Sequence, residues 1–227
     1  TGLRVAAHLT CVDASRSETL QIARDFAKAG VQDIVALRGD APKGAAGFSP
    51  HAEGFANSLE LIAALKAEGD FHLRVGAYPE QHPDAANAQA DVDFLKAKFD
   101  AGADEAITQF FFEAETFLRF RDKCAKAGID QLITPGILPV ENWTAASRFA
   151  ARCGANVPVE LAQGFEAAKR DGREELFALA HATELCDELQ TEGVEHLHFY
   201  TLNRPDLTRD VCLALGIKPK INLRNVA

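Results

Sequence analysis

The chain has 227 residues, of which 47% are hydrophobic and 25% are charged. These values are typical of a globular protein, and the length suits one large domain over residues 1–227. The net charge of −9 at pH 7 argues against a nucleic-acid-binding protein, which needs a basic face for the phosphates. No apolar run reaches the roughly 18 residues of a membrane span, and the first residues do not form a signal peptide. The five cysteines never form a CxxC pair, so we expect a cytoplasmic protein without a disulfide framework.

Short segments rich in β-branched or aromatic residues, bounded by turn residues, predict six strands. They span residues 4–11, 33–37, 72–78, 105–111, 131–137 and 196–202. Amphipathic stretches between them, each closing at or near a glycine, predict seven helices over residues 17–29, 57–68, 88–101, 113–127, 142–152, 173–192 and 205–215. The patch 157–161 has strand-like composition, but Pro158 in its middle argues against a strand.

Strands that alternate with helices indicate an α/β protein with a parallel sheet. Two architectures compete, the doubly wound open sheet and the (βα)8 barrel. No GxGxxG follows the first predicted strand and no GxxxxGK[ST] occurs, so the usual phosphate-binding motifs of the open sheet are absent. Polar or turn residues end every predicted strand, and a barrel builds its active-site face at those ends. We therefore predict a (βα)8 TIM barrel, of which this chain supplies six strands.

Two of these strand ends combine several chemically useful groups. Residues 38–40 (Arg-Gly-Asp) offer a cation, an unhindered backbone and a carboxylate; the alternative interpretation is a surface turn. Residues 78–82 (Tyr-Pro-Glu-Gln-His) offer an aromatic ring, a carboxylate and an imidazole; the alternative is a solvated loop.

Single polar residues mark other strands. His8 lies in an apolar run, where a histidine is more often a core residue than a ligand. Gln109 stands beside three phenylalanines, and its amide needs hydrogen-bond partners that a ligand can supply. Arg204 is either a carboxylate clamp or a charge at a helix start.

A metal site is a weak alternative. His8, Asp40, Glu80 and His82 could converge on an ion, but no His-x-His, HExxH or paired-cysteine spacing supports one. We predict that the protein holds no metal.

Six segments together resemble the bacterial 5,10-methylenetetrahydrofolate reductases. They are residues 6–11 (AAHLTC), 34–40 (IVALRGD), 77–83 (AYPEQHP), 106–112 (AITQFFF), 135–140 (PGILPV) and 198–204 (HFYTLNR). The resemblance implies a TIM barrel with non-covalent FAD. It also implies the reduction of 5,10-methylenetetrahydrofolate to 5-methyltetrahydrofolate, by ping-pong hydride transfer from NADH or NADPH. The implied setting is cytoplasmic one-carbon metabolism and methionine biosynthesis, in a homo-oligomer.

The resemblance also implies roles for individual residues. The positions that match FAD contacts are His8, Arg38, Gly39, Asp40, Tyr78, His82, Ala85, Asp91 and Lys98. Asp40 would in addition act in catalysis, by tuning the flavin and stabilising charge on the folate. The positions that match substrate contacts are Gln109 and Arg204 for the folate, and Phe149 for a site that folate and nicotinamide share.

The chain departs from the family pattern in two ways. Phe94, Ala97 and Ala145 stand where other members have polar contacts to FAD or to the substrates. The family's first strand carries a general-acid glutamate in an E-F-F-P-P context, which is absent from these 227 residues. We expect the native protein to be longer by about two βα units, because a six-stranded barrel would leave two open edges. Glu80 is the only carboxylate here that we would name as a stand-in for that acid.

Two other hypotheses stay open. The first is a non-catalytic paralogue that binds flavin or folate and lacks the acid-bearing strand. The second is a barrel enzyme of another chemistry, such as a metal-dependent aldolase or lyase, which would bind no flavin.

Overall fold

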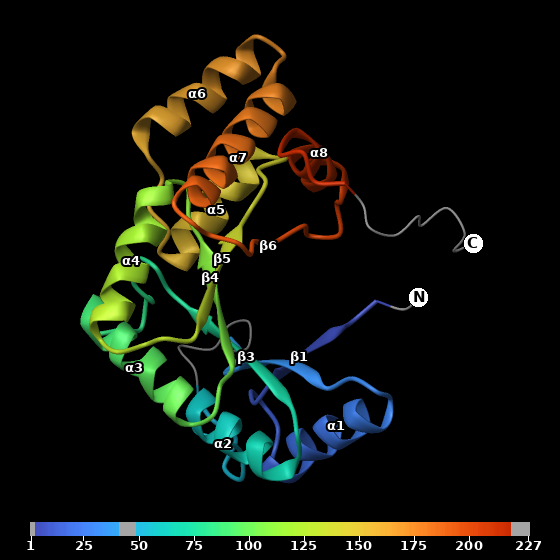
Figure 1. The fold of residues 1–227 in the computed structure, drawn as a ribbon. Helices are drawn as coiled ribbons and strands as arrows, with labels where there is room; N and C mark the ends of the chain where they lie inside the picture. The colour runs from blue at the N-terminus through green and yellow to red at the C-terminus, as the bar shows by residue number, and fades with distance from the viewer. Residues whose placement is uncertain (1–2, 41–48, 219–227) are drawn as a thin grey trace. The chain divides into compact units, whose positions relative to one another are not determined.

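The computed structural model describes residues 3–40 and 49–218, in which one or more helices link each strand to the next (Figure 1). The strands are β1 (Ala6–Thr10), β2 (Asp33–Leu37), β3 (His72–Ala77), β4 (Glu105–Phe110), β5 (Leu132–Ile137) and β6 (His198–Phe199). The helices are α1 (Arg16–Lys28), α2 (Ser58–Glu68), α3 (Ala88–Asp100), α4 (Ala114–Lys126), α5 (Trp143–Cys153), α6 (Val159–Arg170), α7 (Glu174–Thr191) and α8 (Asp206–Ala214). None of these described helices is long and apolar enough to cross a bilayer.

The strands form one sheet in the order β1-β2-β3-β4-β5-β6. The pairs β1–β2, β2–β3 and β5–β6 are parallel, with Ala7 opposite Ile34 and Gly136 opposite His198. Strands that neighbour one another in chain order and are linked by helices have the connectivity of part of a (βα)8 barrel. The predicted α/β class with parallel strands is therefore confirmed.

Six of the predicted strands and seven of the predicted helices are present, and most of their ends agree within two residues. The last strand is the exception, because only His198–Phe199 of the expected residues 196–202 pairs as a strand. The first helix begins at Arg16, since Ser15 caps it in a reciprocal capping box with Glu18.

The prediction that residues 157–161 form no strand is confirmed, and helix α6 begins within them at Val159. Pro158 is the N-cap of α6, a place that tolerates proline because the first helical N–H groups need no partner within the helix. Leu161, Phe165 and Ala168 are the buried residues of α6, at helical spacing. One glycine also differs from expectation: Gly69 closes α2 with an extended backbone (φ 174°), whereas Gly30 closes α1 in the left-handed region (φ 83°).

The chain divides into two compact units, each with its own interior. Unit 1 comprises residues 1–77, 92–107 and 124–133. In it, α1 packs on β1 and on α2, and α2 packs on β2. Ile34, Leu61, Ile62 and Leu73 are fully buried there.

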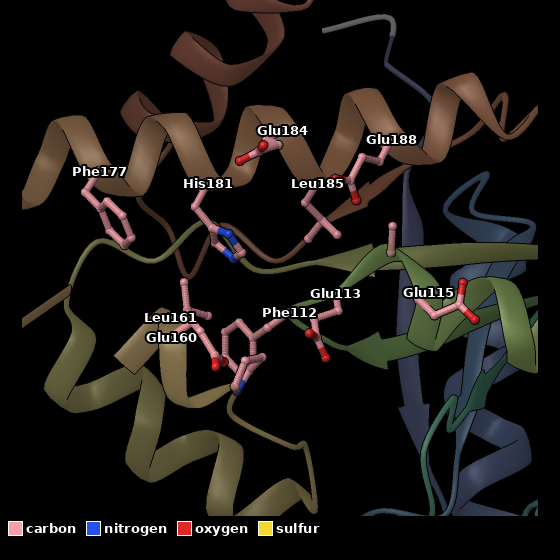
Figure 2. Close-up of a pocket in the computed structure, with 12 residues that line it drawn as sticks. Phe112, Glu113, Glu115, Glu160, Leu161, Phe177, His181, Glu184, Leu185 and Glu188 are labelled. Carbon is pink, nitrogen blue, oxygen red and sulfur yellow. The ribbon is translucent and has the colours of Figure 1, made fainter. Parts of the chain in front are cut away.

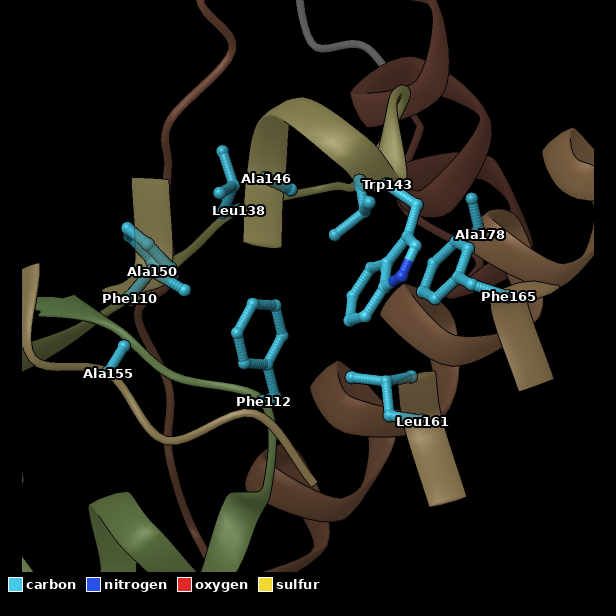
Figure 3. Packing of buried hydrophobic residues seen from close by; sticks show 11 residues of the cluster. Phe110, Phe112, Leu138, Trp143, Ala146, Ala150, Ala155, Leu161, Phe165 and Ala178 are labelled. Carbon is cyan, nitrogen blue, oxygen red and sulfur yellow. The ribbon is translucent and has the colours of Figure 1, made fainter. Parts of the chain in front are cut away.

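Unit 2 comprises residues 78–91, 108–123 and 134–227. Its core is an aromatic cluster in which Trp143 of α5 stacks on Phe165 of α6, with ring centres 4.5 Å apart (Figure 3). Phe112, which follows β4, meets the Trp143 ring edge-on. Helix α7 packs on α6 and on α8. The carboxyl ends of β4, β5 and β6 and the start of α5 therefore lie in one compact unit.

Candidate functional site

In unit 1, the segment after β2 is fixed against the segment after β1. Gly39 has a left-handed backbone (φ 88°), and a Cβ there would lie 2.6 Å from the Cγ1 atom of Val12. Only glycine adopts this backbone conformation easily and also leaves the space beside Val12 free. The Cys11 thiol lies 3.5 Å from the carbonyl oxygen of Arg38. The Arg-Gly-Asp segment therefore has a defined course, with Arg38 partly buried and Asp40 exposed.

His8 and Lys98, also in unit 1, differ in burial. His8 is exposed on β1, so its interpretation as a core histidine is wrong. Lys98 of α3 is only 8% exposed, and its Nζ donates a 2.7 Å hydrogen bond to the carbonyl oxygen of Gly76 in β3. The same Nζ lies 4.9 Å from the ring centre of Phe94. The charge of Lys98 is thus held close to β3 by a carbonyl and a ring face.

In unit 2, the loop after β3 brings together four of the expected FAD positions. Tyr78 and His82 meet edge-on with ring centres 4.4 Å apart. Asp91 accepts a 2.8 Å hydrogen bond from the backbone N–H of His82, and the N–H of Ala85 donates to the carbonyl of His82. The interpretation of this segment as a merely solvated loop is therefore incomplete, because its rings and carboxylate hold one another in place.

Glu80 of the same loop is already engaged. Both of its carboxylate oxygens accept from the backbone N–H of Asn156, at 2.9 and 3.0 Å. Burial raises the pKa of Glu80, the Asn156 hydrogen bond opposes that rise, and the charge of Glu113 adds to it. A raised pKa suits a proton donor, whereas the N–H bond favours the carboxylate.

The ends of β4, β5 and β6 are joined by a close approach at Gly136. The N–H of Gly136 donates to the buried Thr108 hydroxyl oxygen at 2.9 Å, and the Tyr200 hydroxyl donates to the Thr108 carbonyl at 2.8 Å. A Cβ on residue 136 would lie 2.2 Å from that carbonyl oxygen and 2.6 Å from the Tyr200 ring. Burial, as the main cause, raises the pKa of Tyr200 well above its usual range, so the hydroxyl keeps its proton.

Gln109, next to Thr108 on β4, is half-buried. Its Oε1 accepts from the backbone N–H of Phe110 at 3.1 Å. Within residues 3–40 and 49–218, its amide nitrogen makes no hydrogen bond. Two N–H donors of Gln109 are therefore available to a ligand.

A cavity of 370 Å³ in unit 2, which we call the positive pocket, brings together Phe149 and Arg204. Phe149 of α5 stacks on Phe110, with ring centres 5.2 Å apart. Arg204 is paired with Glu141 at 3.1 Å. The pocket is lined by Leu138, Pro139, Val140, Glu141, Asn142, Ala145, Ala146, Phe149, Arg152, Tyr200, Thr201, Leu202 and Arg204. Its wall is mostly apolar, with two arginines and one glutamate, so it suits a planar ligand that carries negative charge.

Sequence reasoning did not single out Arg152 or Glu141. Arg152 follows Phe149 by three residues in α5, and this spacing places two side chains on one helix face. That signal was available from the sequence. The pairing of Glu141 with Arg204, 63 positions away, had no local signal.

A second cavity of unit 2, which we call the acidic pocket, has a volume of 610 Å³. Figure 2 shows His181 pointing from α7 toward Leu161 and Phe112. The pocket is lined by Phe112, Glu113, Ala114, Glu115, Pro158, Glu160, Leu161, Phe177, His181, Glu184, Leu185 and Glu188. Five glutamates and one histidine make its charge opposite to that of the positive pocket. In the part of the chain that the structure describes, no three His, Cys, Asp or Glu side chains gather as a metal site requires.

Known proteins match the chain over nearly its full length. Residues 1–216 match the family model for methylenetetrahydrofolate reductase. The chain is 47% identical over 220 residues to 5,10-methylenetetrahydrofolate reductase of Escherichia coli strain K12. The matched region covers 96% of this chain and 72% of that enzyme. It is 45% identical over 222 residues to the same enzyme of Pectobacterium carotovorum, with coverages of 97% and 72%. It is 35% identical over 222 residues to methylenetetrahydrofolate reductase (NADH) 1 of Arabidopsis thaliana, with coverages of 92% and 38%.

Proposed function

Because the chain belongs to the methylenetetrahydrofolate reductase family, we propose that it uses FAD to reduce 5,10-methylenetetrahydrofolate to 5-methyltetrahydrofolate. The hydride would come from NADH or NADPH in a ping-pong reaction. The proposal includes a single catalytic domain over residues 1–227, a cytoplasmic homo-oligomer and no metal. The two further βα units expected from the resemblance stay a prediction.

The observation that carries the proposal is the positive pocket. It places Phe149 and Arg204, two of the three expected substrate residues, on the wall of one cavity. A pterin or a nicotinamide ring can stack on Phe149, and its carboxylates or phosphates then find arginine close by. A cavity of 370 Å³ is at the smaller end of the range for small-molecule sites. It suits one ring system at a time, as a ping-pong reaction requires.

The residues expected at FAD have chemistry that fits a flavin dinucleotide. In unit 2, Tyr78 and His82 offer fixed rings, and Asp91 and Ala85 fix the loop that carries them. In unit 1, Arg38 and Lys98 offer cations suited to a diphosphate, and Gly39 leaves the backbone open. Bound FAD would supply a two-electron carrier between the two substrates.

Within this proposal, each polar residue has a task that its surroundings support. The Gln109 amide would donate to a carbonyl or ring nitrogen of the folate, since its own oxygen is occupied by the Phe110 N–H. Asp40 is exposed, and its carboxylate would stabilise positive charge that develops on the folate. Precise placement of the ring on Phe149 contributes by orienting the reacting carbon.

The test is an anaerobic visible spectrum of the protein as its gene encodes it, reconstituted with FAD. A flavin spectrum that bleaches with NADH or NADPH and returns with methylenetetrahydrofolate would support both half-reactions. Bleaching without reoxidation by the folate would favour the non-catalytic paralogue. No flavin binding after reconstitution would contradict the proposal and leave a barrel enzyme of another chemistry.

A further inference from the structure

The positive pocket contains one cation whose charge is not balanced by a neighbour. Of its three charged side chains, Arg204 and Glu141 form an ion pair at 3.1 Å. Arg152 makes no ion pair or hydrogen bond within the described residues 3–40 and 49–218. The unbalanced positive charge of the pocket is therefore carried by Arg152.

The position of Arg152 relative to Phe149 is defined by helix α5. The two residues are three apart on the helix, and the Arg152 guanidinium carbon lies 5.5 Å from the Phe149 ring centre. That distance is within the range of a cation–π contact, and the guanidinium makes no hydrogen bond within the described residues. Its five donors are thus available beside the ring on which a substrate would stack.

We propose that Arg152 is a specificity-determining residue, which binds a carboxylate or phosphate of the molecule whose ring lies on Phe149. The inference rests on the proposed function, because that function supplies ligands with both a planar ring and anionic groups. A guanidinium binds both kinds of oxyanion through paired N–H donors. Two sources are open: the glutamyl carboxylates of the folate, and the phosphates of the nicotinamide nucleotide.

A structural role for Arg152 predicts a different behaviour. It stands in the last turn of α5, where the helix dipole favours a cation. If that were its only role, its replacement would lower stability and leave ligand affinity unchanged. Affinity must therefore be measured directly, apart from turnover and apart from the melting temperature.

The experiment is titration calorimetry on the FAD-loaded protein as its gene encodes it. The probes are folic acid with one glutamate, folic acid with three glutamates, and NAD⁺, none of which transfers hydride to the oxidised flavin. The variants are Arg152→Gln, which keeps much of the apolar stem, and Arg152→Lys, which keeps the charge. Arg148→Gln is the matched control, because Arg148 is exposed on the same helix and does not line the pocket.

We expect Arg152→Gln to raise the dissociation constant of at least one probe about tenfold. Arg152→Lys should recover part of the lost affinity. A loss of folic acid affinity that grows with the number of glutamates would show that Arg152 binds the carboxylates. A loss of NAD⁺ affinity would show that it binds the phosphates. The wild-type affinity should also fall more steeply with added salt than that of Arg152→Gln.

The inference is overturned if Arg152→Gln binds all three probes within twofold of the wild type, or if Arg148→Gln weakens them equally. It is also overturned if the wild type binds none of them. Binding that depends on Arg152 in a protein without turnover would leave the inference standing and reject the proposed reductase function alone.

Discussion

The positive pocket and the acidic pocket belong to the same compact unit but differ in both size and charge. The acidic pocket is the larger, at 610 Å³ against 370 Å³. Its five glutamates would repel folates and dinucleotides, which are anions, whereas the positive pocket would attract them. Volume alone would have selected the acidic pocket. The sign of the lining charge decides between the two.

Local helix chemistry explains part of the charge in the acidic pocket. Glu115 and Glu160 lie in the first turns of α4 and α6, where carboxylates stabilise the exposed N–H groups. Glu184 and Glu188 are one turn apart on α7 and face the same side. The helix starts account for Glu115 and Glu160, whereas Glu184 and Glu188 repel one another at this spacing. In the positive pocket, the last turn of α5 accounts for Arg152 in the same way, whereas Arg204 comes from a separate segment of the chain.

The largest expected effect comes from Gly136, because it packs against Tyr200, which lines the positive pocket. The substitution Gly136→Ala puts a methyl group 2.2 Å from the Thr108 carbonyl oxygen and 2.6 Å from the Tyr200 ring. The backbone oxygen has no room to move, so we expect a loss of about 3 kcal/mol or more in the free energy of unfolding. Urea denaturation measures it.

Gly76→Ala is the control for Gly136→Ala. A Cβ at residue 76 meets only the Cδ2 atom of Leu37, at the ordinary contact distance of 3.7 Å. We expect this variant to stay within about 1 kcal/mol of the wild type, since a strand interior tolerates alanine. Equal stabilities for the two variants would contradict the close approach of β4, β5 and Tyr200.

A pair of phenylalanine variants sharpens the assignment of function to one pocket. Phe149→Ala removes the stacking surface of the positive pocket, and Phe177→Ala removes an aromatic wall of the acidic pocket. Stacking of a base on an aromatic ring contributes about 1–3 kcal/mol. We therefore expect Phe149→Ala to weaken folate binding about 10- to 100-fold in a calorimetric titration.

Phe177→Ala should leave the folate dissociation constant within twofold of the wild type. It should nevertheless unfold at lower urea, because the Phe177 ring packs edge-on against Phe165 at 4.8 Å. Weaker folate binding by Phe177→Ala with unchanged binding by Phe149→Ala would reverse the assignment of the two pockets.

Tyr200→Phe tests the hydrogen bond that fixes one wall of the positive pocket. The hydroxyl donates to the Thr108 carbonyl at 2.8 Å, and its loss should cost about 1 kcal/mol of unfolding free energy. The chain has two tyrosines. In a spectroscopic alkaline titration of the wild type, Tyr200 should ionise well above the usual tyrosine pKa, and that late step should vanish in the variant. A variant as stable as the wild type would show that the hydrogen bond contributes nothing net.

Much of the fold could be predicted because local signals agreed with the tertiary structure. Alternating strands and helices and closing glycines predicted the parallel α/β arrangement. Helix α6 was missed because Pro158 was weighed as a strand breaker rather than as a helix start. The buried Leu161, Phe165 and Ala168 carried a helical period that would have corrected this. The short length of β6 could not be predicted from a local pattern, since strand pairing depends on a neighbour far away in the sequence.

The site was predictable to a different extent. Phe149 and Arg204 were expected from the family resemblance, and they line one pocket. Arg152 could have been inferred from its helical spacing to Phe149. The Thr108–Gly136–Tyr200 contact joins the segments of three strands. A glycine in a strand can mark a close approach, but the sequence does not show which backbone makes it.

The smallest expected effect concerns the acidic pocket alone. Burial lowers the pKa of His181, although the charge of Glu184 opposes this. The other carboxylates on the pocket are Glu113, Glu115, Glu160 and Glu188. The unfolded chain binds a proton at an ordinary histidine near pH 6.5, whereas folded His181 binds it only at lower pH. Its contribution to stability is therefore fully present above about pH 6.5 and falls as the pH drops through the folded pKa.

His181→Gln should flatten the decline of unfolding free energy between about pH 7 and pH 5, measured by urea denaturation at each pH. His196→Gln is the control, because it removes an exposed histidine that does not line the acidic pocket. A steeper decline in His181→Gln would mean that the surrounding glutamates, rather than burial, govern the histidine. The acidic pocket would then favour a bound cation, and the contrast with the positive pocket would extend from structure to ligand chemistry.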